Sequence, residues 1–125
     1  MKNYKELKVW KKSIEVVKDA YQLISLLPNN EIYGLSSQMA RAVVSIPSSI
    51  AEGSSRSSDK EYIHFLEIAL GSAFEIETQL IICDKVYNKI EFDIKKLILE
   101  VIEIQMMLAS FITTIKKGLK LKANG

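Results

Sequence analysis

The fold class is decided by residues 5–27, which read K-E-L-K-V-W-K-K-S-I-E-V-V-K-D-A-Y-Q-L-I-S-L-L. Apolar side chains recur there at alternating spacings of three and four residues, which is typical of a helix that packs along one side. The recurring set consists of Leu7, Trp10, Ile14, Val17, Tyr21 and Ile24. The pattern predicts a helix from about Tyr4 to Leu27 with this set facing the core. Pro28 ends it, because proline cannot continue a helix.

A second helix is predicted from about Leu35 or Ser36 to Gly53. Ser36 is a suitable N-cap, and Gly53 stands where a left-handed residue would close the helix. Pro47 lies inside this stretch and argues against a continuous helix. The apolar spacing nevertheless continues across the proline, so we expect one helix with a kink at Pro47.

Two further helices follow. Ser58 and Glu61 form a capping-box pattern for a third helix that runs to about Val86. Asp93 caps a fourth, which is expected to end near Lys117 before a frayed tail. The predicted core face of the fourth helix contains Ile94, Leu97, Val101, Leu108, Ile112 and Ile115. Four helices joined by short loops predict a single all-α domain over residues 1–125, an up-and-down antiparallel four-helix bundle ordered over about 4–118.

Composition agrees with this fold class. The chain has 125 residues, of which 48% are hydrophobic, and its net charge is +2. Five glycines and two prolines are too few for the turns of a β-sandwich or β-barrel. Cys83 is the single cysteine, which suits a reducing compartment. The N-terminus lacks the apolar core of a secretory signal, and no uncharged apolar run is long enough to span a bilayer. We therefore expect a soluble cytoplasmic protein without a membrane partner.

The first and fourth helices are apolar over too wide an arc for a helix that faces only its own core. The first has a second apolar sector made of Val9, Val16, Ala20, Leu23 and Leu27. The fourth has a second face made of Leu99, Ile102, Met106 and Ala109. An unusually wide monomer core is one explanation. We favour an interface between subunits, because exposed apolar patches of this size are uncommon on monomers.

Basic residues collect at one end of the predicted bundle, where the first helix starts, the second and third helices are joined and the fourth helix ends. The candidate nucleic-acid contacts are Lys5, Lys8, Lys12, Arg56, Lys60, Lys116 and Lys117. A basic end face suits a polyanion. Ordinary solvated lysine is the alternative. Any binding should go to the phosphate backbone and weaken in salt.

A polar set interrupts the second and third helices, and it consists of Arg41, Ser45, Ser48, Ser49, Glu52 and Glu75. Antiparallel pairing of the two helices places Arg41 within reach of Glu67 or Glu75. We expect Arg41 to be buried and paired with a carboxylate. A buried polar layer that fixes helix register is the favoured role, with a functional cleft as the alternative.

No catalytic residue, cofactor or metal site is predicted. His64 is the only histidine, and a zinc site needs more nitrogen or sulfur ligands than His64 and distant Cys83 provide. No phosphate-binding loop or nucleotide fingerprint occurs. Cys83 lies on an apolar face and is expected to be an inert core residue.

Several stretches resemble one bacterial family. Residues 45–56 read S-I-P-S-S-I-A-E-G-S-S-R, residues 6–12 read E-L-K-V-W-K-K, and residues 33–42 read Y-G-L-S-S-Q-M-A-R-A. Residues 65–80 read F-L-E-I-A-L-G-S-A-F-E-I-E-T-Q-L. Together they resemble the four-helix-bundle proteins named for open reading frames in intervening sequences of 23S ribosomal RNA genes. Ser49 departs from the pattern, since relatives usually carry asparagine there.

The resemblance implies a four-helix protomer and a ring-shaped homopentamer. It also suggests kinship with accessory proteins of diversity-generating retroelements, which work with a reverse transcriptase and nucleic acid. Our leading hypothesis is a non-enzymatic, oligomeric nucleic-acid-associated protein that binds RNA. The alternative is a structural or adaptor homo-oligomer that binds another protein, such as a reverse-transcriptase accessory subunit.

Overall fold

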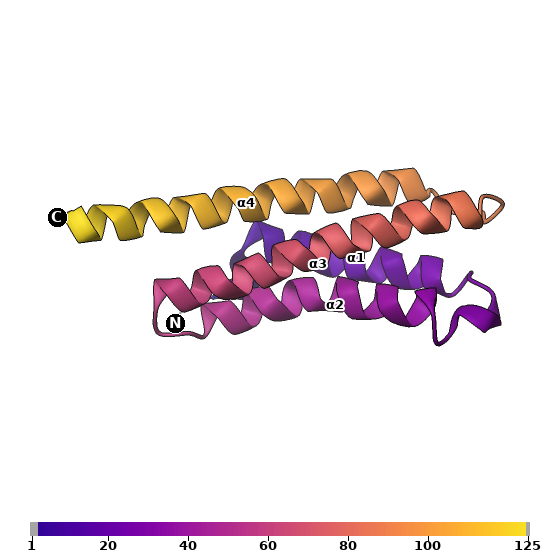
Figure 1. Cartoon of the computed structure of the whole chain (residues 1–125), viewed down its shortest axis with the longest axis horizontal. Coiled ribbons are helices and arrows are strands. Elements are labelled where there is room, and N and C mark those ends of the chain that lie inside the picture. Colours follow the sequence, from indigo (N-terminus) through magenta and orange to yellow (C-terminus); the bar gives the residue numbers. More distant parts are fainter. Residues whose placement is uncertain (1–2, 125) are drawn as a thin grey trace.

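A computed structural model describes the chain over residues 3–124. Its elements in chain order are the short 3₁₀ helix η1 (Tyr4–Glu6), α1 (Lys8–Ile24), the 3₁₀ helix η2 (Asn29–Glu31), α2 (Leu35–Ser54), α3 (Asp59–Val86) and α4 (Ile94–Asn124). No strand occurs among the described residues. The four long helices run up and down beside one another (Figure 1), which confirms the predicted four-helix bundle.

The helices stand at the corners of a square. Helix α1 contacts α2 and α4, and α3 contacts the same two helices. Within the part of the chain that the structure describes, α1 does not contact α3 and α2 does not contact α4. The α1–α2 side of the bundle therefore lies opposite the α3–α4 side.

Helices α3 and α4 begin with side-chain caps at the residues that the sequence predicts. The Glu61 amide donates to Ser58 Oγ at 3.1 Å, and the Lys96 amide donates to Asp93 Oδ1 at 3.0 Å. Each bond satisfies one of the backbone N–H groups that a helix leaves unpaired at its first turn. Both predicted helix starts are confirmed.

The start of α2 differs from the prediction. Ser36 is not its N-cap, because α2 already begins at Leu35 and follows Gly34. The Leu35 amide donates instead to Glu31 Oε1 at 3.2 Å, so a carboxylate from the preceding 3₁₀ turn does the capping. Leu35 follows Glu31 by four positions, and the capping patterns that can be recognised in a sequence do not include that spacing.

Helix α2 passes through Pro47 without a break, as predicted, but Gly53 is not a left-handed terminator. No described glycine has positive φ. A Cβ atom on Gly53 would lie 2.9 Å from Phe65 Cβ and 3.0 Å from Tyr62 Cδ1. Gly53 is thus required because α2 and α3 approach closely there, beside the turn that joins them.

Helix α4 is longer than predicted. It continues past Lys117 and Gly118 to Asn124, and its last turns project beyond the α2–α3 turn (Figure 1). Glycine lowers helix stability by about 1 kcal/mol relative to alanine but does not end a helix while its backbone keeps helical angles. Gly118 has open space around it and no positive φ.

The core uses the predicted face of α4 in full but that of α1 only in part, since Leu7, Trp10, Val17 and Ile24 are partly buried against it. All six predicted core residues of α4 are buried. In α1 the second sector is buried instead, and it consists of Val9, Val16, Ala20, Leu23 and Leu27. Ile14 and Tyr21, predicted to face the core, are 39% and 48% exposed. Ser13 lies within the true core face, where its hydroxyl donates to the Trp10 carbonyl at 2.6 Å. This bond within α1 satisfies the Ser13 hydroxyl, so a polar residue is tolerated in the buried face.

Candidate nucleic-acid interface

Three segments that carry most of the basic residues lie on the same side of the molecule. They are the start of α1, the turn between α2 and α3, and the C-terminal end of α4 (Figure 1). Up-and-down topology produces this grouping, because every second chain reversal falls at the same end of the bundle. The candidate contacts of this basic end are Lys5, Lys8, Lys12, Arg56, Lys60, Lys116 and Lys117.

Several cations of the basic end are already paired within the protomer. The ion pairs are Lys12–Glu103 at 3.1 Å, Arg56–Glu52 at 2.5 Å, Lys116–Glu67 at 3.9 Å and Lys122–Asp59 at 3.6 Å. The Arg56 guanidinium also lies 4.7 Å from the centroid of the Phe65 ring. Exposed pairs of this kind contribute little to stability, about 0–1 kcal/mol each. They do reduce the charge that Lys12, Arg56 and Lys116 offer to a ligand.

The remaining cations are the stronger candidates. Six exposed lysines of the basic end have no carboxylate oxygen within 4.0 Å among the described residues, and they are Lys5, Lys8, Lys11, Lys60, Lys117 and Lys120. Four of them belong to the contact set drawn from the sequence, while Lys11 and Lys120 do not. Ion pairing depends on side-chain geometry, so the sequence could not separate the free lysines from the paired ones.

The predicted polar layer of α2 and α3 is only partly buried. Ser49 is buried and Ser45 is half-buried, whereas the other four members, Arg41, Ser48, Glu52 and Glu75, are exposed. The prediction of a buried, paired Arg41 is wrong for the protomer, since no carboxylate lies within 4.0 Å of it in the described chain. Arg41 precedes buried Val43 by two residues, which is about 200° around the helix and places it on the outer side.

Hydroxyl and amide groups do join the helices inside the bundle. The Ser72 hydroxyl of α3 donates to Ser45 Oγ of α2 at 2.8 Å, and Ser49 Oγ lies 3.4 Å from Ser45 Oγ. The Gln105 amide of α4 donates to the Ala73 carbonyl at 3.3 Å and to Glu77 Oε1 at 2.7 Å. Such bonds fix the register of neighbouring helices. The sequence reasoning missed Gln105, although a lone amide within an apolar helix is a visible signal.

The opposite end of the bundle is tied together by Glu31 and Tyr87. The Tyr87 hydroxyl donates to Glu31 Oε2, while the other carboxylate oxygen accepts from the Leu35 amide. The Tyr87 bond, and then the Leu35 bond, lower the pKa of Glu31 below its ordinary value. The same bond to Glu31 raises the pKa of Tyr87. The contact links the loop after α1 to the end of α3.

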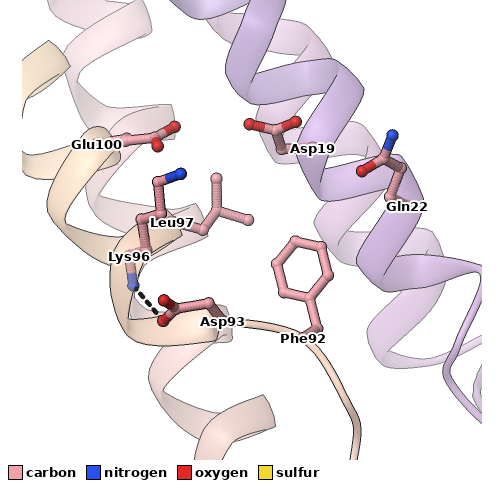
Figure 2. A pocket seen from close by; sticks show the side chains of 7 residues that line it. All are labelled: Asp19, Gln22, Phe92, Asp93, Lys96, Leu97 and Glu100. Atoms are coloured by element: carbon pink, nitrogen blue, oxygen red, sulfur yellow. Dashed lines mark hydrogen bonds between the residues drawn. The ribbon is translucent and has the colours of Figure 1, made fainter.

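A polar pocket of about 220 Å³ opens between α1 and the start of α4. Figure 2 shows Asp19 and Gln22 of α1 facing Lys96, Leu97 and Glu100 of α4, with the aromatic ring of Phe92 at the base. The Lys96 side chain points into the space between the Asp19 and Glu100 carboxyl groups. Charges of both signs therefore line the pocket, and it offers no uniform field for a single kind of ion.

Metal and thiol chemistry find no support in the described chain. Residues 3–122, whose side chains are described, contain no group of three or more His, Cys, Asp or Glu residues that could hold a metal ion. Cys83 is buried. Burial raises the pKa of the Cys83 thiol, and nearby Asp84 and Glu31 raise it further, so the unreactive protonated form is favoured.

An apolar groove of about 520 Å³ runs between the start of α1 and α4. Its floor and walls include Leu7, Val9, Met106, Met107 and Phe111. Helix α4 is also long and apolar enough to cross a membrane by length and composition alone, although only 33% of its most apolar window is buried. Core helices of soluble proteins pass the same test, and α4 supplies a full core face to this bundle. Its uncovered apolar surface is the feature that needs an explanation.

The fold and the basic end define a small helical-bundle protein with a group of exposed lysines at one end of its described residues. The model of the 23S rRNA-intervening sequence protein family matches residues 5–110, and the chain belongs to that family. A solved structure of a protein with unknown function, from the S23 ribosomal protein family of Bacteroides thetaiotaomicron VPI-5482, is similar. It is 27% identical with a TM-score of 0.75, and the match covers 83% of this chain and 97% of that one. No curated protein matches the chain.

Proposed function

We propose that this chain is a non-catalytic, homo-oligomeric nucleic-acid-binding protein of the cytoplasm, which contacts the phosphate backbone of RNA through its basic end. One observation carries the proposal: six exposed lysines at that end have no carboxylate partner within the described chain. Membership of the 23S rRNA-intervening sequence protein family supports RNA as the nucleic acid.

The chemistry of the basic end favours binding without sequence preference. A lysine ammonium is a compact point charge that attracts phosphate but does not distinguish bases. Arg56 is the one guanidinium at the basic end among the described residues, and Glu52 and Phe65 already occupy it. Affinity should therefore fall steeply with salt, since the bound counterions of the nucleic acid are released on binding.

Oligomer formation strengthens such a surface. A single lysine contact is weak and is screened over about 8 Å at physiological salt. Several copies of the basic end arranged around one axis would act together on a long polyanion. The family resemblance implies five copies. Long RNA should accordingly bind more tightly than a short oligonucleotide of the same composition.

The test compares two matched triple variants. Lys8→Glu, Lys60→Glu and Lys117→Glu reverse three unpaired lysines of the basic end. Lys85→Glu, Lys89→Glu and Lys95→Glu reverse three exposed lysines toward the other end. Binding of a long RNA is measured by fluorescence anisotropy across a salt series, with helix content and oligomer mass as controls.

We expect the first variant to bind more weakly and to flatten the plot of log affinity against log salt by about 0.7–0.9 for each lost phosphate contact. The second variant should retain more of the parent affinity and slope. Equal binding by both variants and the parent, or no binding by the parent in low salt, overturns the proposal.

The adaptor function remains the second candidate, because the apolar groove between α1 and α4 suits a protein ligand. Met106 and Met107 line it, and methionine side chains adapt readily to apolar partners. Met107→Glu should abolish capture of such a partner and leave RNA binding unchanged.

A further inference from the structure

The polar pocket between α1 and α4 is lined by one face of each helix. Asp93, just before α4, is followed by Lys96 and Glu100 at spacings of three and four residues, so the three lie along one side of the helix. On α1, Asp19 and Gln22 are three residues apart and face them across the pocket (Figure 2). The pocket lies toward the end of the bundle where α4 begins, whereas the basic end lies where α4 ends. The proposed RNA contact therefore does not involve this pocket.

The charged groups of the pocket do not neutralise one another. The Lys96 side chain points between the Asp19 and Glu100 carboxyl groups, yet no carboxylate oxygen of the described chain lies within 4.0 Å of its ammonium. Asp19 and Glu100 likewise have no ammonium or guanidinium within 4.0 Å among the described residues. Both acidic residues are half-buried, so water screens their charges less than it screens fully exposed ones. Opposite charges thus face a shared space without closing it.

An aromatic and an aliphatic side chain form the apolar part of the pocket. The half-buried Phe92 ring lies at its base, and Leu97 is buried beside it. Such a surface can hold the methylene stem of a ligand and attract a cation to the face of the ring. The Lys96 amide donates to Asp93 Oδ1 at 3.0 Å, which fixes that carboxyl group next to Phe92. The lower part of the pocket therefore suits an apolar stem that ends in a positive charge.

Charge and size together select the class of ligand. Three carboxylates outnumber one ammonium, which disfavours a simple anion. The ammonium of Lys96 stands in the same space and disfavours a bare metal ion, and the described side chains include no cluster that could hold one. The volume of about 220 Å³ is below the range of about 300–1,000 Å³ that drug-sized ligands occupy, so the ligand is small. A small molecule with two cationic groups and one carboxylate meets all of these conditions.

We propose that this pocket binds a free basic α-amino acid, of which arginine is the best match. The α-carboxylate pairs with the Lys96 ammonium, and the α-ammonium lies between the carboxyl groups of Asp19 and Glu100. The side chain runs along Phe92 and brings its terminal charge to Asp93. Arginine fits better than lysine, because a planar guanidinium stacks on an aromatic ring and forms paired bonds to a carboxylate. This binding is separate from the RNA contact and does not depend on it.

The first experiment compares arginine with analogues that each lack one charge. The ¹⁵N-labelled protein is titrated at constant ionic strength, and the amide signals of residues 19–22 and 92–100 are followed by NMR. Arginine amide lacks the carboxylate, N-acetylarginine lacks the α-ammonium, and citrulline lacks the charge of the side chain. Sodium chloride serves as the control for general effects of added ions.

We expect arginine to shift the signals of the pocket saturably, with a dissociation constant on the order of 1 mM, as suits a small ligand in an open pocket. Each analogue should bind roughly five- to tenfold more weakly, because each loses one ion pair with a pocket residue. Sodium chloride should cause no saturable shift.

Single substitutions assign the charges of the ligand to residues. Lys96→Gln should weaken arginine binding roughly five- to tenfold and remove the preference for arginine over arginine amide, because the partner of the carboxylate is gone. Glu100→Gln should reduce the preference for arginine over N-acetylarginine. Lys95→Gln and Glu75→Gln are the matched controls, since each removes the same kind of charge from an exposed residue outside the pocket. Circular dichroism checks that all four variants keep the helix content of the parent.

Three results overturn the inference. One is the absence of a saturable shift in the pocket with arginine. Another is that arginine amide or N-acetylarginine binds as tightly as arginine, which indicates that the pocket takes the terminal residue of a peptide instead. The third is that Lys96→Gln binds arginine as well as Lys95→Gln does. None of these results bears on RNA binding, which the lysine variants of the basic end test separately.

Discussion

Helices α1 and α4 each carry two apolar faces, yet the structure uses them differently. In α4 the predicted face is buried, as Val101 and Leu108 show, and Leu99 of the second face is exposed. In α1 the predicted face is partly exposed at Ile14, and the second sector, with Leu23 at its centre, is buried. The same type of pattern thus predicted the buried face of one helix and only the margin of the buried face of the other.

The difference shows that apolar spacing identifies a helix more securely than it identifies the buried side. The two apolar sectors of α1 lie about 100° apart, and either could fill the space between two neighbouring helices. Ser13 interrupts the sector that is buried, whereas the sector predicted from the spacing is apolar throughout.

The largest expected effect tests which face of α1 is the core. Leu23→Ala should lower the free energy of unfolding by about 2–5 kcal/mol, because it opens a cavity at a side chain with no exposed surface. Ile14→Ala should cost less than about 1.5 kcal/mol. Urea denaturation at matched protein concentrations measures the free energy of unfolding of both variants. A larger loss for Ile14→Ala would reverse the assignment of the two faces.

The next-largest effect compares the contributions to stability of Gln105 and Ser13, the polar residues in the buried faces of α4 and α1. Gln105→Ala should cost about 1–3 kcal/mol, since it removes two hydrogen bonds from α4 to α3 and truncates a buried side chain. Ser13→Ala should change stability by less than about 0.5 kcal/mol, because that hydroxyl bonds only within its own helix. Thermal and urea unfolding measure both. Equal costs would remove the distinction between a local and an inter-helix bond.

A smaller effect, a gain in stability, is expected at the C-terminal end of α4. Helix α1 has no corresponding extension. Gly118→Ala should stabilise the helix by about 0.5–1 kcal/mol, because a Cβ there meets open space. Hydrogen exchange of residues 116–124 measures the gain. Gly53→Ala is the matched control and should destabilise the fold, since its Cβ would meet Phe65. No added protection in Gly118→Ala would place the segment outside the stable helix.

The smallest effect concerns the bond that connects the loop after α1 with the end of α3. The pKa of Glu31 is lowered in the folded chain, chiefly by Tyr87, so its contribution is present above the unfolded pKa and is lost as pH falls through the folded pKa. Tyr87→Phe should therefore reduce the loss of stability on acidification below about pH 4. Unfolding at pH 7 and at acidic pH, with Tyr21→Phe as control, gives the comparison. An unchanged pH profile would show that the bond is not formed in solution.

The candidate site was predicted in outline. The sequence places lysines in three segments, and helix order alone brings those segments to one end. The sequence did not reveal that Lys12, Arg56 and Lys116 form ion pairs with carboxylates. Their partners, Glu103, Glu52 and Glu67 respectively, lie on other turns or other helices. The exposed position of Arg41 was also missed, since the small residues around it suit a buried layer as well as an outer surface.

The sequence by itself determined the number of helices, the caps at Ser58 and Asp93, the passage of α2 through Pro47 and the core face of α4. These features depend on hydrogen bonds and spacing within a few residues. The tertiary structure decided which face of α1 is buried, why Gly53 is needed and which lysines stay free. Those outcomes depend on the distance and orientation of neighbouring helices, and local spacing carries no record of them.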